Sequence, residues 1–256
     1  SSAASDVYKR QQYFTYEMIK EQNEGKTDST PDSAMIDMFN AMVDEMFDYG
    51  RFILKNKRKN PSNDLLSAIA NAKIEGEELS DEFLDGSWLL IIFAGNDTTR
   101  NTMSGGIKLL HENQHQKELL INNYDLLPGF INETVRCVSP VIHMRRTSLI
   151  ETEIGGQKIG PHEKIALWYG AANRDPEIFD KPDEFNIQRE NAEKHLAFGI
   201  GRHTCLGKPI ALMQLNEFYS QFLKRFPDFE MNGEWKVAPN NFVHAIQEMP
   251  IKFTKE

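Results

Sequence analysis

One glycine-rich segment of the sequence carries a cysteine. Three glycines surround Cys205 within Phe198–Gly207, and a helical pattern begins directly after this segment. A thiolate at a helix N-terminus is stabilised by the helix dipole and by free N–H groups, so Cys205 is a candidate metal ligand or nucleophile. A nucleophile needs a base, and His203, two residues away, points elsewhere in most loop geometries. The alternative for Cys205 is a small buried hydrophobic side chain.

A second polar segment, Ala94–Arg100, lies inside a stretch that is otherwise apolar. Gly95 lets a ligand approach the backbone, and a threonine hydroxyl can accept or donate a hydrogen bond within the helix and open it. Asp97 beside Thr98 in a dry pocket would form a proton relay. The alternative is a helix kink in which the threonine pair is hydrogen-bonded and faces another helix.

A third segment, His111–His115, has the HExxH spacing. This spacing places two imidazoles on one helix face for zinc and leaves Glu112 as a base, and Glu133 is available as a third ligand. Against zinc, the segment is polar on every side, as expected of a solvated helix end. A zinc hydrolase is therefore the less favoured alternative.

The elements that must position these residues are mainly helical. Apolar residues recur at helical spacing from Tyr13 to about Lys59, with a break around Gly25–Pro31. The stretch that begins at Ser80 is nearly apolar all round in its first half, which predicts a buried helix. Short strands are predicted between Arg146 and Trp168. Further helices are predicted at about 63–72, 80–110, 114–121, 128–138 and 208–226.

The composition is that of an ordinary globular protein, with 29 Lys+Arg, 38 Asp+Glu and a net charge of −9. This acidic balance argues against nucleic acid as a partner. The longest apolar run, Trp88–Ala94, is too short for a membrane span, which needs about 20 residues. Two cysteines are too few for a disulfide framework, so we expect a cytoplasmic protein. Residues 1–12 lack any periodicity, and we expect them to be non-native or disordered.

The glycine-rich segment resembles the haem-thiolate signature of the cytochrome P-450 family, F-G-x-G-x-H-x-C-x-G, at every fixed position. Ala94–Thr99 resembles the A-G-x-D-T-T of the family's long central helix, and Glu133–Arg136 resembles its Glu-x-x-Arg. The resemblance implies a mainly α, partial cytochrome P-450 fold with a long central helix and a small β region. Residues 13–256 would form the C-terminal part of a single domain, without about the N-terminal third of a family member.

The resemblance also implies a haem b cofactor (iron protoporphyrin IX) with Cys205 as the axial ligand of its iron. Arg146 and His203 would bind the propionates, because both can donate charge-assisted hydrogen bonds, and Arg145 or His143 would share that role. Phe198 would shield the sulfur of Cys205. The remaining cofactor-binding residues that the resemblance implies are Gly199 and Ala94.

Two further sets of residues have roles by resemblance only. Asp97 and Thr98 would deliver protons during oxygen activation, and Thr98 is the nearer of the two. The other set is a structural triad that fixes the cysteine loop and takes no part in the reaction. Its members are Glu133, Arg136 and Arg189.

The function implied is a haem-thiolate monooxygenase that hydroxylates an apolar substrate such as a sterol, a terpenoid or another lipid. It would use dioxygen and two electrons from a ferredoxin or flavodoxin type carrier. The alternatives are a truncated haem-binding remnant without turnover and the zinc hydrolase described above.

Overall fold

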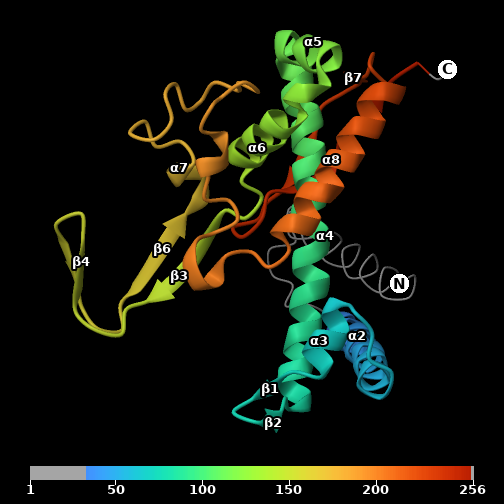
Figure 1. Cartoon of the computed structure of the whole chain (residues 1–256), viewed down its shortest axis with the longest axis vertical. Helices are drawn as coiled ribbons and strands as arrows, with labels where there is room; N and C mark the ends of the chain where they lie inside the picture. The colour runs from blue at the N-terminus through green and yellow to red at the C-terminus, as the bar shows by residue number, and fades with distance from the viewer. Residues whose placement is uncertain (1–32, 255–256) are drawn as a thin grey trace. The chain divides into compact units, whose positions relative to one another are not determined.

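The computed structural model describes residues 33–254 (Figure 1). The chain divides into two compact units, residues 1–96 and 97–256, which we describe separately. The boundary falls inside the longest helix, α4 (Asp81–Glu112). The expectation about residues 1–12 lies outside the described residues, and the assignment of 13–256 to one domain stays a prediction.

The first unit contains α2 (Ser33–Lys59), α3 (Leu65–Ala70), the hairpin of β1 (Lys73–Ile74) and β2 (Glu77–Glu78), and the start of α4. Side chains cap both later helices, as their sequences predict. Asp64 Oδ1 accepts the N–H of Ser67 at 2.8 Å before α3, and Ser80 Oγ accepts the N–H of Phe83 at 3.2 Å before α4.

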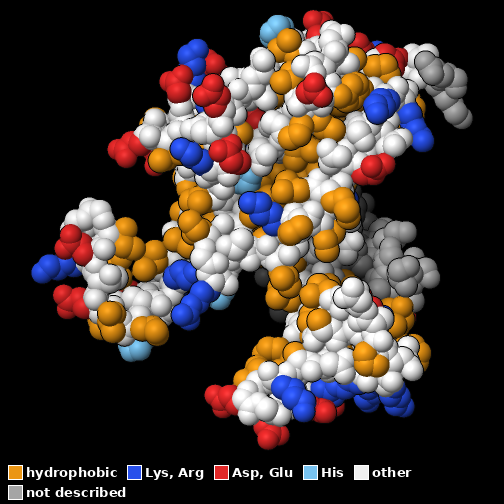
Figure 2. All heavy atoms as spheres, viewed as in Figure 1, with side chains coloured by type: hydrophobic (Ala, Val, Ile, Leu, Met, Phe, Trp, Pro, Cys, Tyr) orange, Lys and Arg blue, Asp and Glu red, His pale blue; other side chains and the backbone are white. Residues whose placement is uncertain are grey.

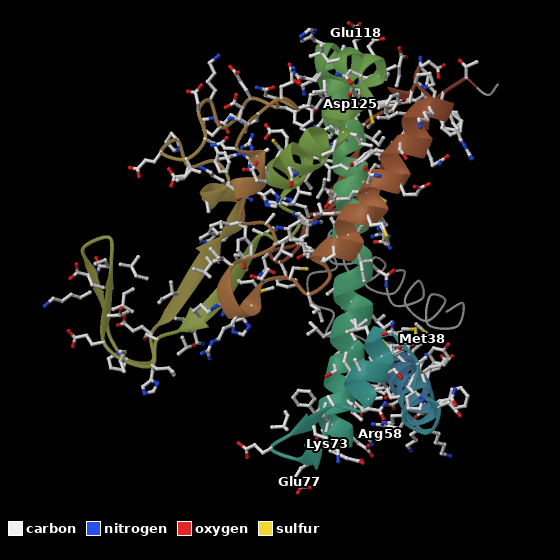
Figure 3. The ribbon with its side chains drawn as sticks, viewed as in Figure 1. Met38, Arg58, Lys73, Glu77, Glu118 and Asp125 are labelled. Atoms are coloured by element: carbon white, nitrogen blue, oxygen red, sulfur yellow. The ribbon has the colours of Figure 1, made fainter. Side chains whose placement is uncertain are left out.

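The core of this unit lies between α2, α3 and α4. Trp88 is buried, and its indole N–H donates to the carbonyl of Met46 at 3.0 Å. Arg58, labelled in Figure 3, joins α2 to the segments that follow, because it donates to the carbonyls of Ala70 at 2.7 Å and Leu79 at 3.0 Å. The buried apolar residues are Met46, Leu54, Ala70, Leu79, Leu84 and Trp88.

The first half of α4 is less buried than its sequence predicts. Leu84 and Trp88 are buried, but Leu90 is 68% exposed and Phe93 is 47% exposed. Within the described part of this unit, α2 and α3 cover the face that carries Leu84 and Trp88. The prediction of burial all round was therefore wrong. The helix is not opened at its polar segment, where the Thr98 carbonyl accepts the hydroxyl of Thr102 at 2.8 Å.

The helices of the second unit are the rest of α4, α5 (Gln114–Asn122), α6 (Leu127–Val138), the short α7 (Tyr169–Ala172) and α8 (Lys208–Arg225). Figure 1 shows α8 running beside the second half of α4. α8 turns Leu215, Tyr219 and Leu223 inward at helical spacing, and all three are buried. They join a cluster that includes Ile107, Leu110, Leu120, Phe130, Val135, Ile187 and Phe229.

The strands are short and all pairs are antiparallel. β3 (His143–Thr147) pairs with β6 (Lys164–Trp168), and β4 (Thr152–Ile154) pairs with β5 (Gln157–Ile159), close to the predicted β region. Two C-terminal pairs were not predicted, because strands of two to four residues show too little alternation. They are β7 (Glu230–Met231) with β10 (Ile251–Lys252), and β8 (Lys236–Ala238) with β9 (Ala245–Glu248).

The observed architecture is mainly helical with small β pairs, as predicted. The described part of the chain also contains the single-turn 3₁₀ helices η1 (Tyr124–Leu126), η2 (Ala192–Lys194) and η3 (Gly201–His203). Over residues 33–254, no helix combines the length and the apolar character that a membrane span requires.

Gly106 allows α4 and α8 to approach closely. A Cβ at Gly106 would lie 2.1 Å from Oη of Tyr219, whose hydroxyl donates to the carbonyl of Thr102 at 2.9 Å. Gly106→Ala should therefore lower the free energy of unfolding by about 1–3 kcal/mol through overpacking. Urea unfolding measures the effect. The matched control is Gly86→Ala in the same helix, where a Cβ meets nothing within 4 Å. Equal losses in both variants would contradict the packing argument.

Candidate functional site

The candidate site is built on the loop that precedes α8. The N–H of Cys205 donates to the carbonyl of Phe198, and the N–H of Gly199 donates to the carbonyl of Leu196, each at 2.8 Å. Gly199 and Gly201 have φ angles of 69° and 73°, a conformation that residues with side chains rarely adopt. The Cys205 thiol is free and exposed, so the alternative of a buried hydrophobic side chain was wrong.

The thiol lies close to the start of α8. The N–H of Lys208, the first residue of α8, donates to the carbonyl of Cys205 at 3.3 Å. The ammonium of Lys208 also lies 5.5 Å from the ring centre of Phe198, which packs against the core. The loop therefore presents an exposed thiol in surroundings that suit a metal ligand.

The three candidate residues of β3 lie on two faces of its ladder. Successive side chains of a strand point to opposite sides, so His143 and Arg145 share one face and Arg146 lies on the other. His143 stacks on its cross-strand neighbour Trp168, with ring centres 4.9 Å apart, and its buried Nδ1 has no hydrogen-bond partner. Arg146 is half-buried, and Arg145 is exposed.

The candidate cations are not neutralised by carboxylates. In the described part of the chain, no ion pair involves Arg145, Arg146 or His203, although acidic residues outnumber basic ones. The guanidinium of Arg146 donates only to the neighbouring carbonyl of Arg145, at 2.9 Å. No hydrogen bond joins His203 to β3 within residues 33–254. These groups are thus available to an anion but are not linked to one another.

The polar segment of α4 contains an ion pair within the helix. The Asp97 carboxylate pairs with Arg100 at 2.7 Å, and the Asp97 carbonyl accepts from Asn101 Nδ2 at 2.8 Å. Thr98 is half-buried. Ala94 is exposed and belongs to the first unit, whereas Asp97 and Thr98 belong to the second. Sequence reasoning missed the ion pair with Arg100, although its spacing of three residues is a common helical pairing.

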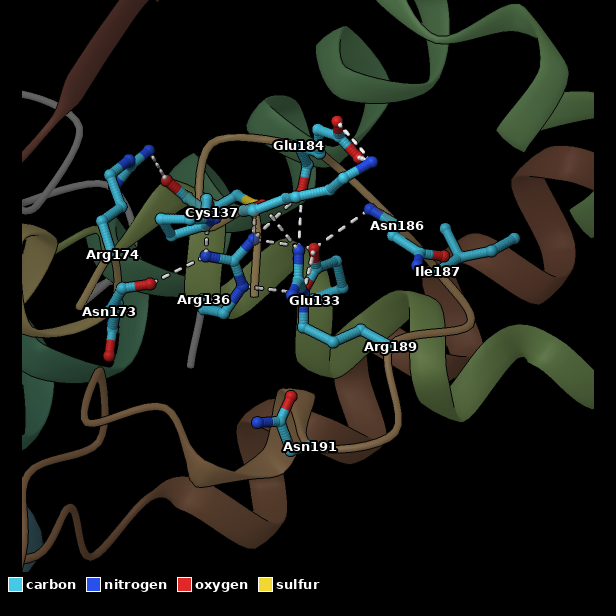
Figure 4. A network of polar contacts seen from close by, with 12 residues as sticks. Glu133, Arg136, Cys137, Asn173, Arg174, Glu184, Asn186, Ile187, Arg189 and Asn191 are labelled. Carbon is cyan, nitrogen blue, oxygen red and sulfur yellow. Dashed lines mark hydrogen bonds and ion pairs between the residues drawn. The ribbon is translucent and has the colours of Figure 1, made fainter. Parts of the chain in front are cut away.

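The structure brings Glu133, Arg136 and Arg189 together (Figure 4). Glu133 Oε2 accepts Nε of Arg136 at 2.7 Å, and its Oε1 accepts Nε of Arg189 at 3.1 Å. The side chains of Glu133 and Arg136 are fully buried, and that of Arg189 is 7% exposed. Burial alone would lower the pKa of Arg136, but the hydrogen bonds and charge of Glu133 outweigh it and raise that pKa.

The two histidines of the HExxH segment do not share a helix. α4 ends at Glu112 and α5 starts at Gln114, so Asn113 separates His111 from His115. His111 Nδ1 instead accepts the N–H of Met231 at 3.3 Å, and the Glu133 carboxylate is held by arginines. Over residues 33–254, no group of three His, Cys, Asp or Glu side chains is placed to hold a metal ion. The zinc alternative is therefore wrong.

Two buried polar residues beside the cysteine loop were missed. Asn173 is fully buried and its Oδ1 accepts the N–H of Leu196 at 2.6 Å. His195 is 7% exposed, and its Nδ1 accepts the N–H of Ala197 at 3.3 Å. Both stand in polar loops, where such side chains are ordinarily solvated. Closeness to the glycine-rich segment could have drawn attention to His195, whereas Asn173 lies 25 residues before Phe198.

The sequence model of the cytochrome P-450 family matches residues 30–253. The chain belongs to the cytochrome P-450 family. Among its relatives, steroid C26-monooxygenase of Mycobacterium tuberculosis is 38% identical over 210 residues, which are 81% of this chain and 56% of that protein. Linalool 8-monooxygenase of Pseudomonas putida is 33% identical over 210 residues, 82% of this chain and 52% of that protein. The chain spans about half the length of the curated relatives it matches.

Solved cytochrome P-450 structures show the same fold. CYP109E1 from Bacillus megaterium, in complex with testosterone, has a TM-score of 0.78 and 32% identity, covering 86% of this chain and 61% of that one. CYP268A2 from Mycobacterium marinum, in complex with pseudoionone, has a TM-score of 0.80 and 33% identity, covering 86% and 53%. The predicted partial cytochrome P-450 fold is therefore confirmed.

The residues present fit the haem that the family implies. The exposed thiol of Cys205 is a suitable donor for iron, and the unpaired arginines suit carboxylates. Hydrophobic side chains also lie exposed along α8 and the loop before it (Figure 2), where a flat apolar group would cover them. These are Ile200, Leu206, Ile210 and Met213, each between 52% and 75% exposed.

The buried His195 predicts a pH-dependent stability. Burial, together with the charges of Lys208 and Arg136, lowers the pKa of His195 to about 4, while Glu193 acts in the opposite sense. The unfolded chain has the ordinary histidine pKa of about 6.5, so it binds more protons than the folded chain between pH 6.5 and 4. Stability from this group is complete above pH 6.5 and is lost as the pH falls through this window.

We expect a loss of about 2 kcal/mol in the free energy of unfolding between pH 7 and pH 5 from His195 alone. Urea unfolding at a series of pH values measures it in the natural protein and in His195→Gln. The control is His162→Gln, since His162 is exposed. If His195→Gln keeps the full slope between pH 7 and pH 5, the buried neutral histidine is not its source.

Proposed function

We propose that the protein is a haem-thiolate monooxygenase that hydroxylates an apolar substrate. The observation that carries this proposal is the exposed Cys205 thiol, held in a glycine-framed loop at the start of α8. It is supported by relatives whose names are steroid C26-monooxygenase and linalool 8-monooxygenase. Both cysteines are free, which fits a reducing compartment, so the proposal includes a cytoplasmic location.

In this proposal Cys205 holds the iron of haem b, and Phe198 covers the sulfur. Arg146 and His203 bind the propionates, since neither is neutralised by a carboxylate among residues 33–254. When bound, the haem supplies the oxidation of a C–H bond with dioxygen and two electrons. Arg145 or His143 would act from the opposite face of β3 to Arg146. Gly199, in the cysteine loop, would also contact the cofactor.

We further propose that Thr98 and Asp97 deliver protons during oxygen activation. Thr98 is half-buried, so its hydroxyl can hold a proton away from bulk water. The side chain of Asp97 is 27% exposed, which lets it exchange protons with solvent. In this proposal the Asp97 carboxylate also carries the ion pair with Arg100.

The proposed substrate is a sterol, a terpenoid or a related lipid. The names of the two curated relatives support this class, as do the testosterone and pseudoionone of the two structural neighbours. The electrons would come from a ferredoxin or flavodoxin type carrier, which is acidic and would meet a basic residue beside the cysteine loop. Arg202 is exposed and available for this contact, whereas Lys208 lies against Phe198.

The spectrum of the reduced carbon monoxide complex tests the thiolate assignment. Protein expressed from its complete gene should show a strongly red-shifted Soret band, and Cys205→Ser should lose it because the iron then lacks its thiolate. The matched control is Cys137→Ser, which should keep the band. Burial and the charge of Glu133 raise the pKa of Cys137 to about 11, so this thiol stays protonated. A natural protein without any haem signal would overturn the proposal.

Replacing Thr98 tests the relay and separates turnover from haem binding alone. Thr98→Ala should lower the yield of hydroxylated product per NADH consumed by at least about tenfold, because proton delivery is lost. The control is Thr99→Ala, a buried neighbour on the same helix. Coupling that survives in Thr98→Ala would contradict the relay. A red-shifted spectrum without substrate-dependent NADH consumption would instead identify a haem-binding protein without turnover.

A further inference from the structure

Asn173 lies between the buried Glu133–Arg136–Arg189 network and the cysteine loop. It is fully buried, directly after α7, and its N–H donates to the carbonyl of Tyr169 at 2.8 Å. Its carbonyl accepts Nη1 of Arg136 at 2.7 Å, and its side-chain Oδ1 accepts the N–H of Leu196 at 2.6 Å. One residue therefore contacts both the network and the first part of the loop.

The orientation of the Asn173 amide is fixed by Ser139, the residue that ends α6. The Ser139 hydroxyl donates to the carbonyl of Arg136 at 2.9 Å, so toward Asn173 it can only accept. It accepts Nδ2 of Asn173 at 2.7 Å. The amide nitrogen is thereby directed to Ser139, and the amide oxygen is directed to Leu196. A flipped amide would lose the bond to Leu196, because an N–H donor would then face the N–H of Leu196.

The bond to Leu196 leads directly to Cys205. The carbonyl of Leu196 accepts the N–H of Gly199, and the carbonyl of Phe198 accepts the N–H of Cys205, each at 2.8 Å. Across residues 33–254, the bond from Leu196 to Asn173 is the one that ties the segment 196–206 to a part of the chain distant in sequence. The other hydrogen bonds of this segment stay within it or reach its immediate neighbours.

We propose that Asn173 is a positioning residue that fixes the position of the Cys205 loop relative to the Glu133–Arg136 ion pair. It touches neither the thiol nor any reacting group. Without it, the N–H of Leu196 would be left unsatisfied. The two turns that carry Cys205 would then be held by the packing of Ala197 and Phe198 against the core and by the start of α8. The reason for positioning the Cys205 thiol rests on the proposed function, but the link that Asn173 makes between the ion pair and the loop does not.

Hydrogen exchange of the loop amides tests this link through Asn173. The protein is expressed from its complete gene and is measured as purified. Asn173→Leu keeps the approximate volume but removes both side-chain bonds. Asn173→Asp keeps an oxygen for the N–H of Leu196, and the Ser139 hydroxyl can rotate to donate to the second oxygen. Leu120→Ala is the matched control for stability. Leu120 is fully buried in the same core, but it forms none of the hydrogen bonds that link Asn173 to the loop.

We expect loop exchange in Asn173→Leu to exceed that in Leu120→Ala by at least about tenfold, and Asn173→Asp to restore protection. Equal exchange in Asn173→Leu and Leu120→Ala, or a folded Asn173→Asp that exchanges as fast as Asn173→Leu, would overturn the proposal. If Asn173→Leu does not fold, Ser139→Ala decides, because it removes the bond that holds the amide nitrogen of Asn173. Loop exchange should then rise above that of Leu120→Ala, and no rise would overturn the proposal. None of these measurements needs haem, so a missing Soret shift would refute the proposed function alone.

Discussion

The second unit depends on the ion pairs and hydrogen bonds of the buried Glu133 carboxylate. A carboxylate and two guanidinium groups away from water cost several kcal/mol each unless every charge and donor is satisfied. Glu133 meets this condition by accepting from Arg136, from Arg189 and from the N–H of Asn186 at 3.0 Å. The surplus positive charge is spread over backbone carbonyls, among them that of Pro182 at 2.8 Å from Arg136. The network therefore orders the long loop between α7 and α8, in which the short helices η2 and η3 are the regular elements.

Local signals in the sequence predicted most of the helices but not their surroundings. The periodicity of α6 and α8 is contained in the segments themselves, and their observed limits lie within about one residue of those expected. Burial depends on what covers a helix, so the apolar first half of α4 misled the prediction at Leu90 and Phe93. The HExxH spacing was misleading for a related reason. It presumes a continuous helix, and Asn113 ends α4 in the middle of the motif.

In the candidate site too, the features that are local in sequence were predicted and the contacts between distant residues were not. The cysteine loop was predicted because its glycines and Cys205 are close in sequence, and Gly199 and Gly201 do adopt positive φ angles. The contact between Glu133 and Arg189 joins residues 56 positions apart, and only a family resemblance suggested it. Asn173 carries no periodic or compositional signal at all. The sequence alone also did not show to which side the side chains of β3 point. The pairing of β3 with β6 places Arg145 and Arg146 on opposite faces.

The division of the chain between its two units also divides the proposed chemistry. Cys205, His203 and Arg146, the proposed holders of the cofactor, all belong to the second unit, which also contains the buried ion network. Ala94 lies before the boundary, and Asp97 and Thr98 lie directly after it on the same continuous helix. Proton delivery would depend on α4 remaining helical across the boundary, where the Thr98 carbonyl is held by Thr102 and the Asp97 carbonyl by Asn101.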